Sequence, residues 1–376
     1  MLNQKKVFKA LEKNDIHFFT GVPDSYLNGF CNYLINNLPQ ESNIIAANEG
    51  NAVAIAAGHY IATGEIGLVY MQNSGMGNAA NPLISLADKN VYSIPMILLI
   101  GWRGQPSTGD WAQHKLQGEI TPKLLEVMNI PYTILEDDEE CFENTVKEAA
   151  FFAKTNRTSY ALIAPKGIMA GEKINNKDEC YPLSREEAIE TVIDNVEKNA
   201  IYCATTGRAT RELFFIRERR GEGKQNDFLN VGSMGHASSV ALGIAQAKPH
   251  RKVVCLDGDC AAMMHMGSFT TVSKVNASNL LHIVLNNGAH ESVGGQPSAG
   301  FLIDFTKIAE ASGYKTVGKA VTNKEELVCA LKELACAEKP SFIEVRIHKG
   351  LNGKLPALDF SHRSAIDGLM NELRSN

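Results

Sequence analysis

The chain has 376 residues, of which 44% are apolar, and a formal net charge of −5 at pH 7. This length allows about two or three domains with sizeable cores, and the negative charge argues against a nucleic-acid-binding protein, which usually carries a basic excess. No apolar stretch reaches the roughly 18 residues of a membrane span, and the eight cysteines form no C-x-x-C pair, which predicts reduced thiols in a cytoplasmic protein.

Short β-branched and apolar runs alternate with helical patterns along the chain, which is typical of parallel sheets with helices on both faces. In chain order, the predicted strands are Ile44–Ala46, Gly67–Gln72, Ser93–Ile100, Ser159–Ile163, Val253–Asp257, Leu281–Leu285 and Ser341–Val345. A polar stretch at residues 171–188 interrupts the pattern. We therefore predict an α/β fold of two doubly wound parallel-sheet domains of similar topology, at residues 1–170 and 189–376, with residues 171–188 as the linker.

The first candidate residues lie around the strand Gly67–Gln72. Glu49 begins a small-residue helical pattern, and an acid in the first turn of a helix is by itself a common structural feature. Gly75 follows the strand, opens a helix and begins a G-x-G-x-x-A sequence. A dinucleotide site needs an acid at the end of the next strand, where Arg103 stands instead, so we expect a glycine turn with another purpose.

The segment GWRGQPSTGDWAQHK follows the strand Ser93–Ile100 and contains Arg103, His114 and Lys115. Ligand sites in parallel sheets form beyond the carboxyl ends of the strands. An arginine can offer two parallel donors to an anion. Arg103 and Lys115 are therefore candidates for binding an anionic substrate group, with a solvated surface charge as the alternative for each.

In the second half, two predicted strands end in polar residues. Asp259 follows the strand Val253–Asp257, and Asn286 and Gly288 follow the next strand. A carboxylate, an amide oxygen and a loop carbonyl are too few for an all-protein cage, but they suit Mg²⁺ that also binds phosphate oxygens and water. The alternatives are that Asp259 only caps the following helix and that Asn-Asn-Gly is only a turn.

The sequence Gly258-Asp259…Asn286-Asn287 resembles the metal–diphosphate motif of thiamine-diphosphate enzymes, although Cys260 stands where glycine is usual. The segment VGSMGHASSVALGIA resembles the one that places a bulky apolar side chain, here Met234, beneath the thiazolium ring. The segment AANEGNAVAIAAG resembles the one whose glutamate contacts the aminopyrimidine ring. The resemblance covers both halves, with the pyrimidine-binding domain first, the diphosphate-binding domain second and no middle domain.

The resemblance implies thiamine diphosphate and Mg²⁺ as cofactors, with Asp259, Asn286 and the Gly288 carbonyl as metal ligands. Glu49 would be catalytic, and His114 and His290 are candidates for proton transfer, with a structural histidine as the alternative for each. The implied cofactor-binding residues are Glu49, Gly75, Thr205, Thr206, Gly232, Met234, Gly258, Asp259, Cys260, Ala261, Asn286 and Gly288.

Within this family, the two-domain form resembles the decarboxylases of phosphonopyruvate and sulfopyruvate, through segments such as TGVPDSYL and NNGAHESVGGQPS. The resemblance implies a carboxy-lyase of phosphonate biosynthesis, which converts 3-phosphonopyruvate to phosphonoacetaldehyde and CO₂. It also implies a homodimer or larger homo-oligomer, with the cofactor between the first domain of one subunit and the second domain of another. A sulfopyruvate decarboxylase, a carboligase resembling acetolactate synthase and a non-catalytic nucleotide-binding module remain as alternatives.

Overall fold

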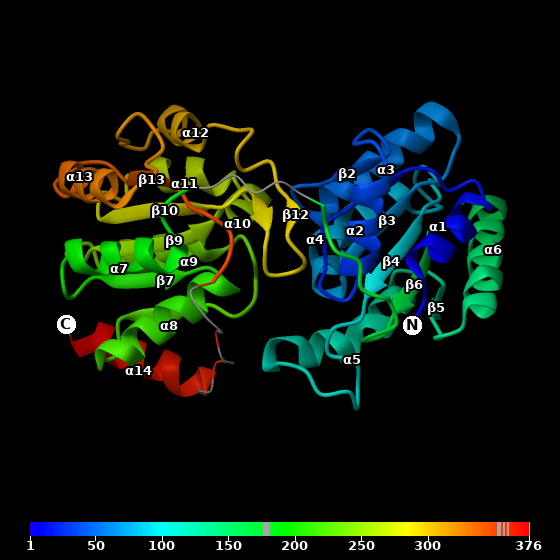
Figure 1. Cartoon of the computed structure of the whole chain (residues 1–376), viewed down its shortest axis with the longest axis horizontal. Helices are drawn as coiled ribbons and strands as arrows, with labels where there is room; N and C mark the ends of the chain where they lie inside the picture. The colour runs from blue at the N-terminus through cyan, green and yellow to red at the C-terminus, as the bar shows by residue number, and fades with distance from the viewer. Residues whose placement is uncertain (176–180, 352–354, 356–357, 359–360, 376) are drawn as a thin grey trace. The chain divides into compact units, whose positions relative to one another are not determined.

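The computed structural model describes residues 1–175, 181–351, 355, 358 and 361–375. The chain divides into two compact units, one formed by Met1–Asn176 with Ser292–Gln296 and the other by Lys177–Glu291 with Pro297–Asn376. Each unit is a parallel sheet covered by helices on both faces, which confirms the predicted fold class (Figure 1). Across the described ranges, no helix combines the length and the apolar character needed to cross a membrane.

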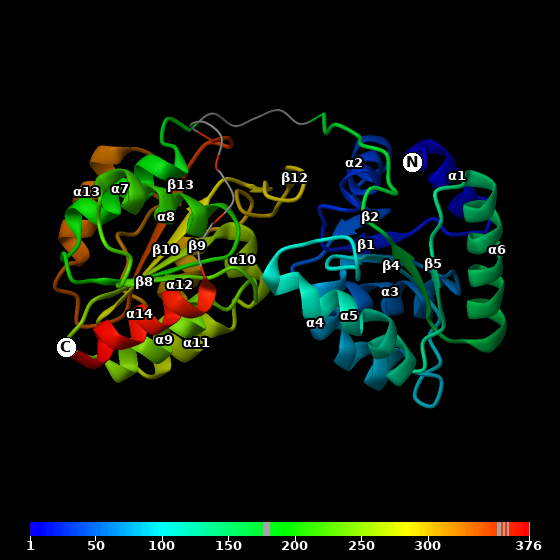
Figure 2. The same ribbon diagram turned by 90° about the horizontal axis from the view of Figure 1, so that it is seen from below.

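The first unit contains a six-stranded parallel sheet in the order β2-β1-β3-β4-β6-β5. Its strands are β1 (Phe19–Gly21), β2 (Asn43–Ile45), β3 (Leu68–Gln72), β4 (Ile97–Gly101), β5 (Tyr132–Ile134) and β6 (Tyr160–Ala164). Its helices and helical turns are α1 (Gln4–Glu12), α2 (Asn28–Asn37), α3 (Glu49–Thr63), η1 (Asn73–Gly75), α4 (Met76–Pro82), η2 (Leu83–Ala87), α5 (Ala112–Val127) and α6 (Glu139–Asn156). One apolar core lies between the sheet and α1, α2 and α6, and a second lies between the sheet and α3, α4 and α5 (Figure 2).

The second unit contains a five-stranded parallel sheet in the order β13-β10-β9-β7-β8. Its strands are β7 (Ile201–Ala204), β8 (Asp227–Leu229), β9 (Val253–Gly258), β10 (Leu280–Asn286) and β13 (Ser341–Arg346). The short strands β11 (Ala289–His290) and β12 (Gln296–Pro297) pair separately, and Gln296 is the last residue of the Ser292–Gln296 segment of the first unit. Its helices are α7 (Arg185–Asn195), α8 (Arg208–Arg220), α9 (Ala237–Ala247), α10 (Asp259–Met264), α11 (Ser268–Lys274), α12 (Phe305–Ser312), α13 (Lys324–Leu334) and α14 (His362–Ser375). Helices α7, α8 and α13 cover one face, and α9, α11, α12 and α14 cover the other.

The segment predicted as the linker is partly helical, because α7 begins at Arg185. The Ser184 hydroxyl accepts a hydrogen bond from the Glu187 backbone N–H, and the Glu187 carboxylate accepts one from the Ser184 backbone. This capping box satisfies two backbone donors that a helix otherwise leaves unpaired, so the helix starts inside the polar stretch. Residues 176–180 of the predicted linker lie outside the described residues.

In each unit, the order of strands reverses beside the first strand, between β1 and β3 and between β7 and β9. In open parallel sheets, ligands bind in the crevice at this reversal, beyond the carboxyl ends of the strands. Gly75 lies just after β3, Thr205 just after β7, and Asp259 just after β9. The fold therefore places several of the predicted site residues at the sheet edge where a ligand is expected.

Candidate active site

Glu49 is the first residue of α3, and its carboxyl is buried beside the end of β3, with the residue only 5% exposed. Its Oε2 accepts a hydrogen bond from Asn78 Nδ2 at 2.8 Å. A Cβ atom on Gly75 would lie 2.3 Å from Glu49 Oε1, so only glycine leaves room for the carboxyl there. Burial raises the pKa of Glu49, and the hydrogen bond from Asn78 offsets only part of that effect. A buried carboxyl with a raised pKa suits general acid–base work.

Arg103 lies just beyond the end of β4 and is paired with a carboxylate that the sequence reasoning did not identify. Its Nε and Nη2 donate to the two oxygens of Asp110 at 2.8 and 2.7 Å, and its Nη1 donates to Ser25 Oγ at 3.2 Å. The guanidinium also lies 5.0 Å from the centre of the Tyr26 ring. Burial lowers the pKa of Arg103, but the hydrogen bonds and charge of Asp110 outweigh burial and raise it overall. The guanidinium is thus a charged group held in one orientation.

Asp24 is a second polar residue that the sequence reasoning missed. Its carboxylate is buried beyond the end of β1, where Gln72 Nε2 donates to Oδ1 at 2.6 Å and the Tyr26 backbone N–H donates to Oδ2 at 2.9 Å. Burial raises the pKa of Asp24, and the hydrogen bond from Gln72 acts against that rise. Asp24 lies in the segment TGVPDSYL, three residues after the end of β1, and β1 itself was not predicted, so no strand end marked this residue in the sequence.

The two candidate histidines lie in different units. His114 is in the first turn of α5, and its Nδ1 is buried without a hydrogen-bond partner among the residues that the structure describes. His290 is in β11 of the second unit. Burial lowers the pKa of each to about 4, so both imidazoles are neutral near pH 7. Lys115 is exposed next to His114.

Two of the predicted metal ligands, Asp259 and Asn286, lie at the ends of β9 and β10, which are adjacent parallel strands with Leu285 opposite Gly258. A Cβ atom on Gly300 would lie 2.5 Å from both Asp259 Oδ2 and Asn286 Oδ1, so these two oxygens converge on one point. The Ser298 hydroxyl lies 3.0 Å from the same point and donates to Asp259 Oδ2. The structure therefore brings side-chain oxygens of Asp259, Asn286 and Ser298, from three separate segments, close together.

This group of oxygens fits a divalent metal ion. Asp259 is 3% exposed, and burial raises its pKa to about 6, with the hydrogen bond from Ser298 offsetting part of that rise. Burying a carboxylate without a cation is costly, and hard oxygen ligands are those that Mg²⁺ prefers. The Gly288 carbonyl accepts the Ser298 backbone N–H at 2.9 Å and has a second lone pair for a metal.

The remaining predicted cofactor residues lie on the loops at this edge. Thr205, Thr206 and Gly207 connect β7 to α8, and the Thr205 hydroxyl is buried without a hydrogen-bond partner within the described ranges. Cys260 and Ala261 are buried in α10, and burial raises the pKa of the Cys260 thiol, which stays protonated. Gly232 and the half-buried Met234 lie in the loop before α9.

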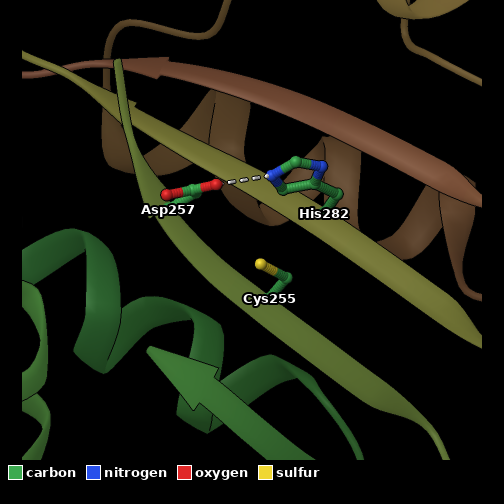
Figure 3. A group of neighbouring side chains, drawn as sticks. All are labelled: Cys255, Asp257 and His282. Atoms are coloured by element: carbon green, nitrogen blue, oxygen red, sulfur yellow. Dashed lines mark hydrogen bonds and ion pairs between the residues drawn. The ribbon is translucent and has the colours of Figure 1, made fainter. Parts of the chain in front are cut away.

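A separate polar cluster lies deeper in the second unit, formed by Cys255, Asp257 and His282 (Figure 3). His282 Nε2 lies 3.3 Å from Asp257 Oδ2, and Asp257 Oδ1 accepts the Gly258 backbone N–H at 3.0 Å. The three ligand atoms lie within 4.8 Å of one another, but all three residues are fully buried. A metal site needs an entry path, so we interpret the cluster as support for the backbone of Gly258. This interpretation accounts for a buried aspartate next to the last residue of β9.

Two family models match the chain. The description "Thiamine pyrophosphate enzyme, N-terminal TPP binding domain" applies to residues 4–125, and "Thiamine pyrophosphate enzyme, C-terminal TPP binding domain" applies to residues 212–345. These matches confirm the predicted thiamine diphosphate cofactor.

Curated relatives span most of the chain. The chain is 32% identical over 349 residues to a phosphonopyruvate decarboxylase of Streptomyces viridochromogenes, covering 88% of this chain and 84% of that protein. It is 31% identical over 369 residues to a phosphonopyruvate decarboxylase of Streptomyces hygroscopicus, covering 93% and 88%. It is 29% identical over 388 residues to a sulfopyruvate decarboxylase of Methanosarcina acetivorans, covering 96% and 95%.

Proposed function

The chain belongs to the thiamine pyrophosphate enzymes, in the group of the phosphonopyruvate and sulfopyruvate decarboxylases, and we propose that it converts 3-phosphonopyruvate to phosphonoacetaldehyde and CO₂. Because the chain belongs to an enzyme family, the alternative of a non-catalytic nucleotide-binding module is no longer needed. The observation that carries the proposal is that one chain, similar to phosphonopyruvate decarboxylases over most of its length, has both a buried Glu49 carboxyl and the converging oxygens of Asp259 and Asn286.

Decarboxylation of a 2-oxo acid leaves an electron pair on the carbonyl carbon, and bound thiamine diphosphate supplies the electron sink for it. Asp259, Asn286 and the Gly288 carbonyl would hold Mg²⁺ at the diphosphate. Glu49 would hold a proton at the aminopyrimidine ring, a role suited to its buried carboxyl. The neutral imidazoles of His114 and His290 are candidates for moving the proton that replaces CO₂.

We also propose a homodimer or larger homo-oligomer, in which the Glu49 unit of one subunit and the Asp259 unit of another share a cofactor. The predicted cofactor residues are divided between the two units, and the resemblance to the family supports a site shared by two subunits. A cytoplasmic location remains a prediction from the cysteines, since the seven that the structure describes are all unpaired.

Sulfopyruvate is the second candidate substrate, because the chain is also similar to a sulfopyruvate decarboxylase. A phosphonate can carry two negative charges, whereas a sulfonate carries one. Measured kcat/KM should favour phosphonopyruvate by at least about tenfold, which corresponds to about 1.4 kcal/mol. Faster turnover of sulfopyruvate would overturn the phosphonate assignment, and formation of acetolactate from pyruvate would identify a carboligase.

Arg103→Ala should raise KM for phosphonopyruvate with a smaller fall in kcat. We propose that Arg103 binds the phosphonate, an interaction made alike in the ground state and the transition state. The expected loss is about 2–4 kcal/mol, typical of truncating one partner of a buried charge pair. Steady-state kinetics with pyruvate, which lacks the phosphonate group, provide the comparison. The variant should turn over pyruvate no worse than the wild type.

Equal impairment with both substrates would show that Arg103 only supports Asp110. The anion site would then have to be sought at Arg208–Arg211 or at His290–Gln296. Arg208 already pairs with Glu291, with a separation of 2.5 Å between Nη1 and Oε1.

Gly75→Ala should lower kcat, whereas Gly77→Ala should not. Gly75 has φ −72°, which alanine adopts without strain, so the penalty comes from the Glu49 side chain that the methyl group would displace. Displacing a catalytic group by about 1 Å can cost about 10²-fold in rate. A Cβ atom on Gly77 meets no atom within 4 Å, which makes Gly77→Ala the matched control. Identical kcat values for the two variants would show that the position of Glu49 is unimportant.

A further inference from the structure

The side-chain amide of Asn286 has hydrogen-bond partners at both ends. Its Nδ2 donates to the Gly300 carbonyl at 2.7 Å and to Glu344 Oε1 at 2.9 Å, so both amide protons are used. Its Oδ1 accepts the Gly288 backbone N–H at 3.1 Å and has one lone pair left. A reversed amide would place its NH₂ against the Gly288 N–H and its oxygen against two acceptors. These contacts therefore fix which end of the amide points toward Asp259.

Glu344 reaches Asn286 from the neighbouring strand. Glu344 is in β13, which pairs with β10 so that Val284 lies opposite Glu344 and Asn286 lies opposite Arg346. The Glu344 side chain is fully buried, and its Oε1 also accepts a hydrogen bond from Arg346 Nε at 3.1 Å. Asn286 Nδ2 and Arg346 Nε are both donors, so Glu344 Oε1 accepts both hydrogen bonds. Glu344 therefore binds the nitrogen end of the Asn286 amide.

From these contacts we infer that Glu344 is a positioning residue for the metal site, which holds the Asn286 amide with its oxygen facing Asp259. Glu344 touches the amide nitrogen of Asn286, at the end opposite the oxygen that converges with Asp259 Oδ2. Arg346 supplies the positive charge that compensates for burying this carboxylate. The inference rests on the proposed function, because Asp259 and Asn286 are metal ligands only there.

The test measures the Kd of Mn²⁺ by electron paramagnetic resonance of the free ion, with thiamine diphosphate saturating. Mn²⁺ takes the same oxygen ligands as Mg²⁺. Glu344→Met keeps a similar volume but removes the acceptor, and we expect Kd to rise about 10–100-fold, the usual cost of losing a partner that orients a metal ligand. Glu344→Gln keeps an acceptor oxygen and should lose less affinity. Glu333→Met, on the exposed face of α13 in the same unit, is the control and should leave Kd unchanged.

A double-mutant cycle separates positioning from general structural damage. If Glu344 acts through Asn286, Glu344→Met should have no further effect on Kd in an Asn286→Ala background. Thermal unfolding verifies that each variant is folded. If Glu344→Met does not fold, Glu344→Asp takes its place, because its shorter carboxylate keeps the charge but loses the contact.

The outcomes distinguish this inference from the proposed function. A wild-type protein that binds no Mn²⁺ with thiamine diphosphate would overturn the metal site itself. If the wild-type protein binds Mn²⁺, the metal site is supported, and the Kd values of the variants then decide the role of Glu344. Unchanged affinity in folded Glu344→Met, or an equal loss with and without Asn286, would overturn the positioning role alone.

Discussion

Asp259→Ala should abolish the Mg²⁺-dependent binding of thiamine diphosphate and leave the protein folded. The variant loses the only carboxylate among the three proposed metal ligands, so the charge of the diphosphate would remain unneutralised at the strand ends. Isothermal titration calorimetry with Mg²⁺ present measures the affinity directly. Asp194→Ala on the surface of α7 is a control that should bind the cofactor normally.

The unfolding temperature of the same variant provides a second measurement. In the protein without metal, burial raises the pKa of Asp259 from 3.8 to about 6, so ionising this carboxyl destabilises the fold as the pH rises through that range. Asp259→Ala should therefore unfold at an equal or higher temperature than the wild type at pH 7, and this advantage should disappear below about pH 4. In the calorimetric titration, normal affinity of Asp259→Ala for thiamine diphosphate would refute the metal assignment.

Glu49→Gln should lower kcat by about 10²–10⁴, the usual contribution of one acid–base group. Glutamine has the same shape and can still accept the hydrogen bond from Asn78, but it cannot exchange a proton with the aminopyrimidine ring. The affinity for thiamine diphosphate should therefore change much less than kcat. Glu65→Gln, at a side chain that is 56% exposed in the same unit, is the matched control.

Exchange of the thiazolium C2 proton, followed by NMR, tests the role of Glu49 more directly than turnover. The exchange should slow in Glu49→Gln in parallel with kcat. Exchange at the wild-type rate would show that Glu49 does not act on this proton.

Every strand of five or more residues could be predicted from the sequence, whereas β2 is the one shorter strand among the described residues that was predicted. All seven predicted strands are present, although the one expected from Ser93 begins at Ile97, because Ser93 has φ 51° and Pro95 lacks a backbone N–H. Strands β1, β5, β7, β8, β11 and β12 were missed. Each has two to four residues, which gives little periodic pattern, and each forms through pairing with a neighbouring strand.

Local sequence likewise indicated some residues of the candidate site and not others. Gly75, Arg103, Asp259 and Asn286 could be found because each lies at or just beyond the end of a predicted strand. Glu344 lies within a strand, and its contact with Asn286 depends on how β10 and β13 pair. The contact of Arg103 with Asp110 depends on how the loop after β4 folds back. Such contacts between separate segments are set by tertiary structure rather than by local sequence.

The most direct measurement follows both products of 3-phosphonopyruvate after the protein has been stripped of thiamine diphosphate and metal. Adding thiamine diphosphate and Mg²⁺ together should produce CO₂ and phosphonoacetaldehyde in equal amounts, whereas either one alone should produce neither. No product with both cofactors present, or undiminished product without thiamine diphosphate, would contradict the proposed function.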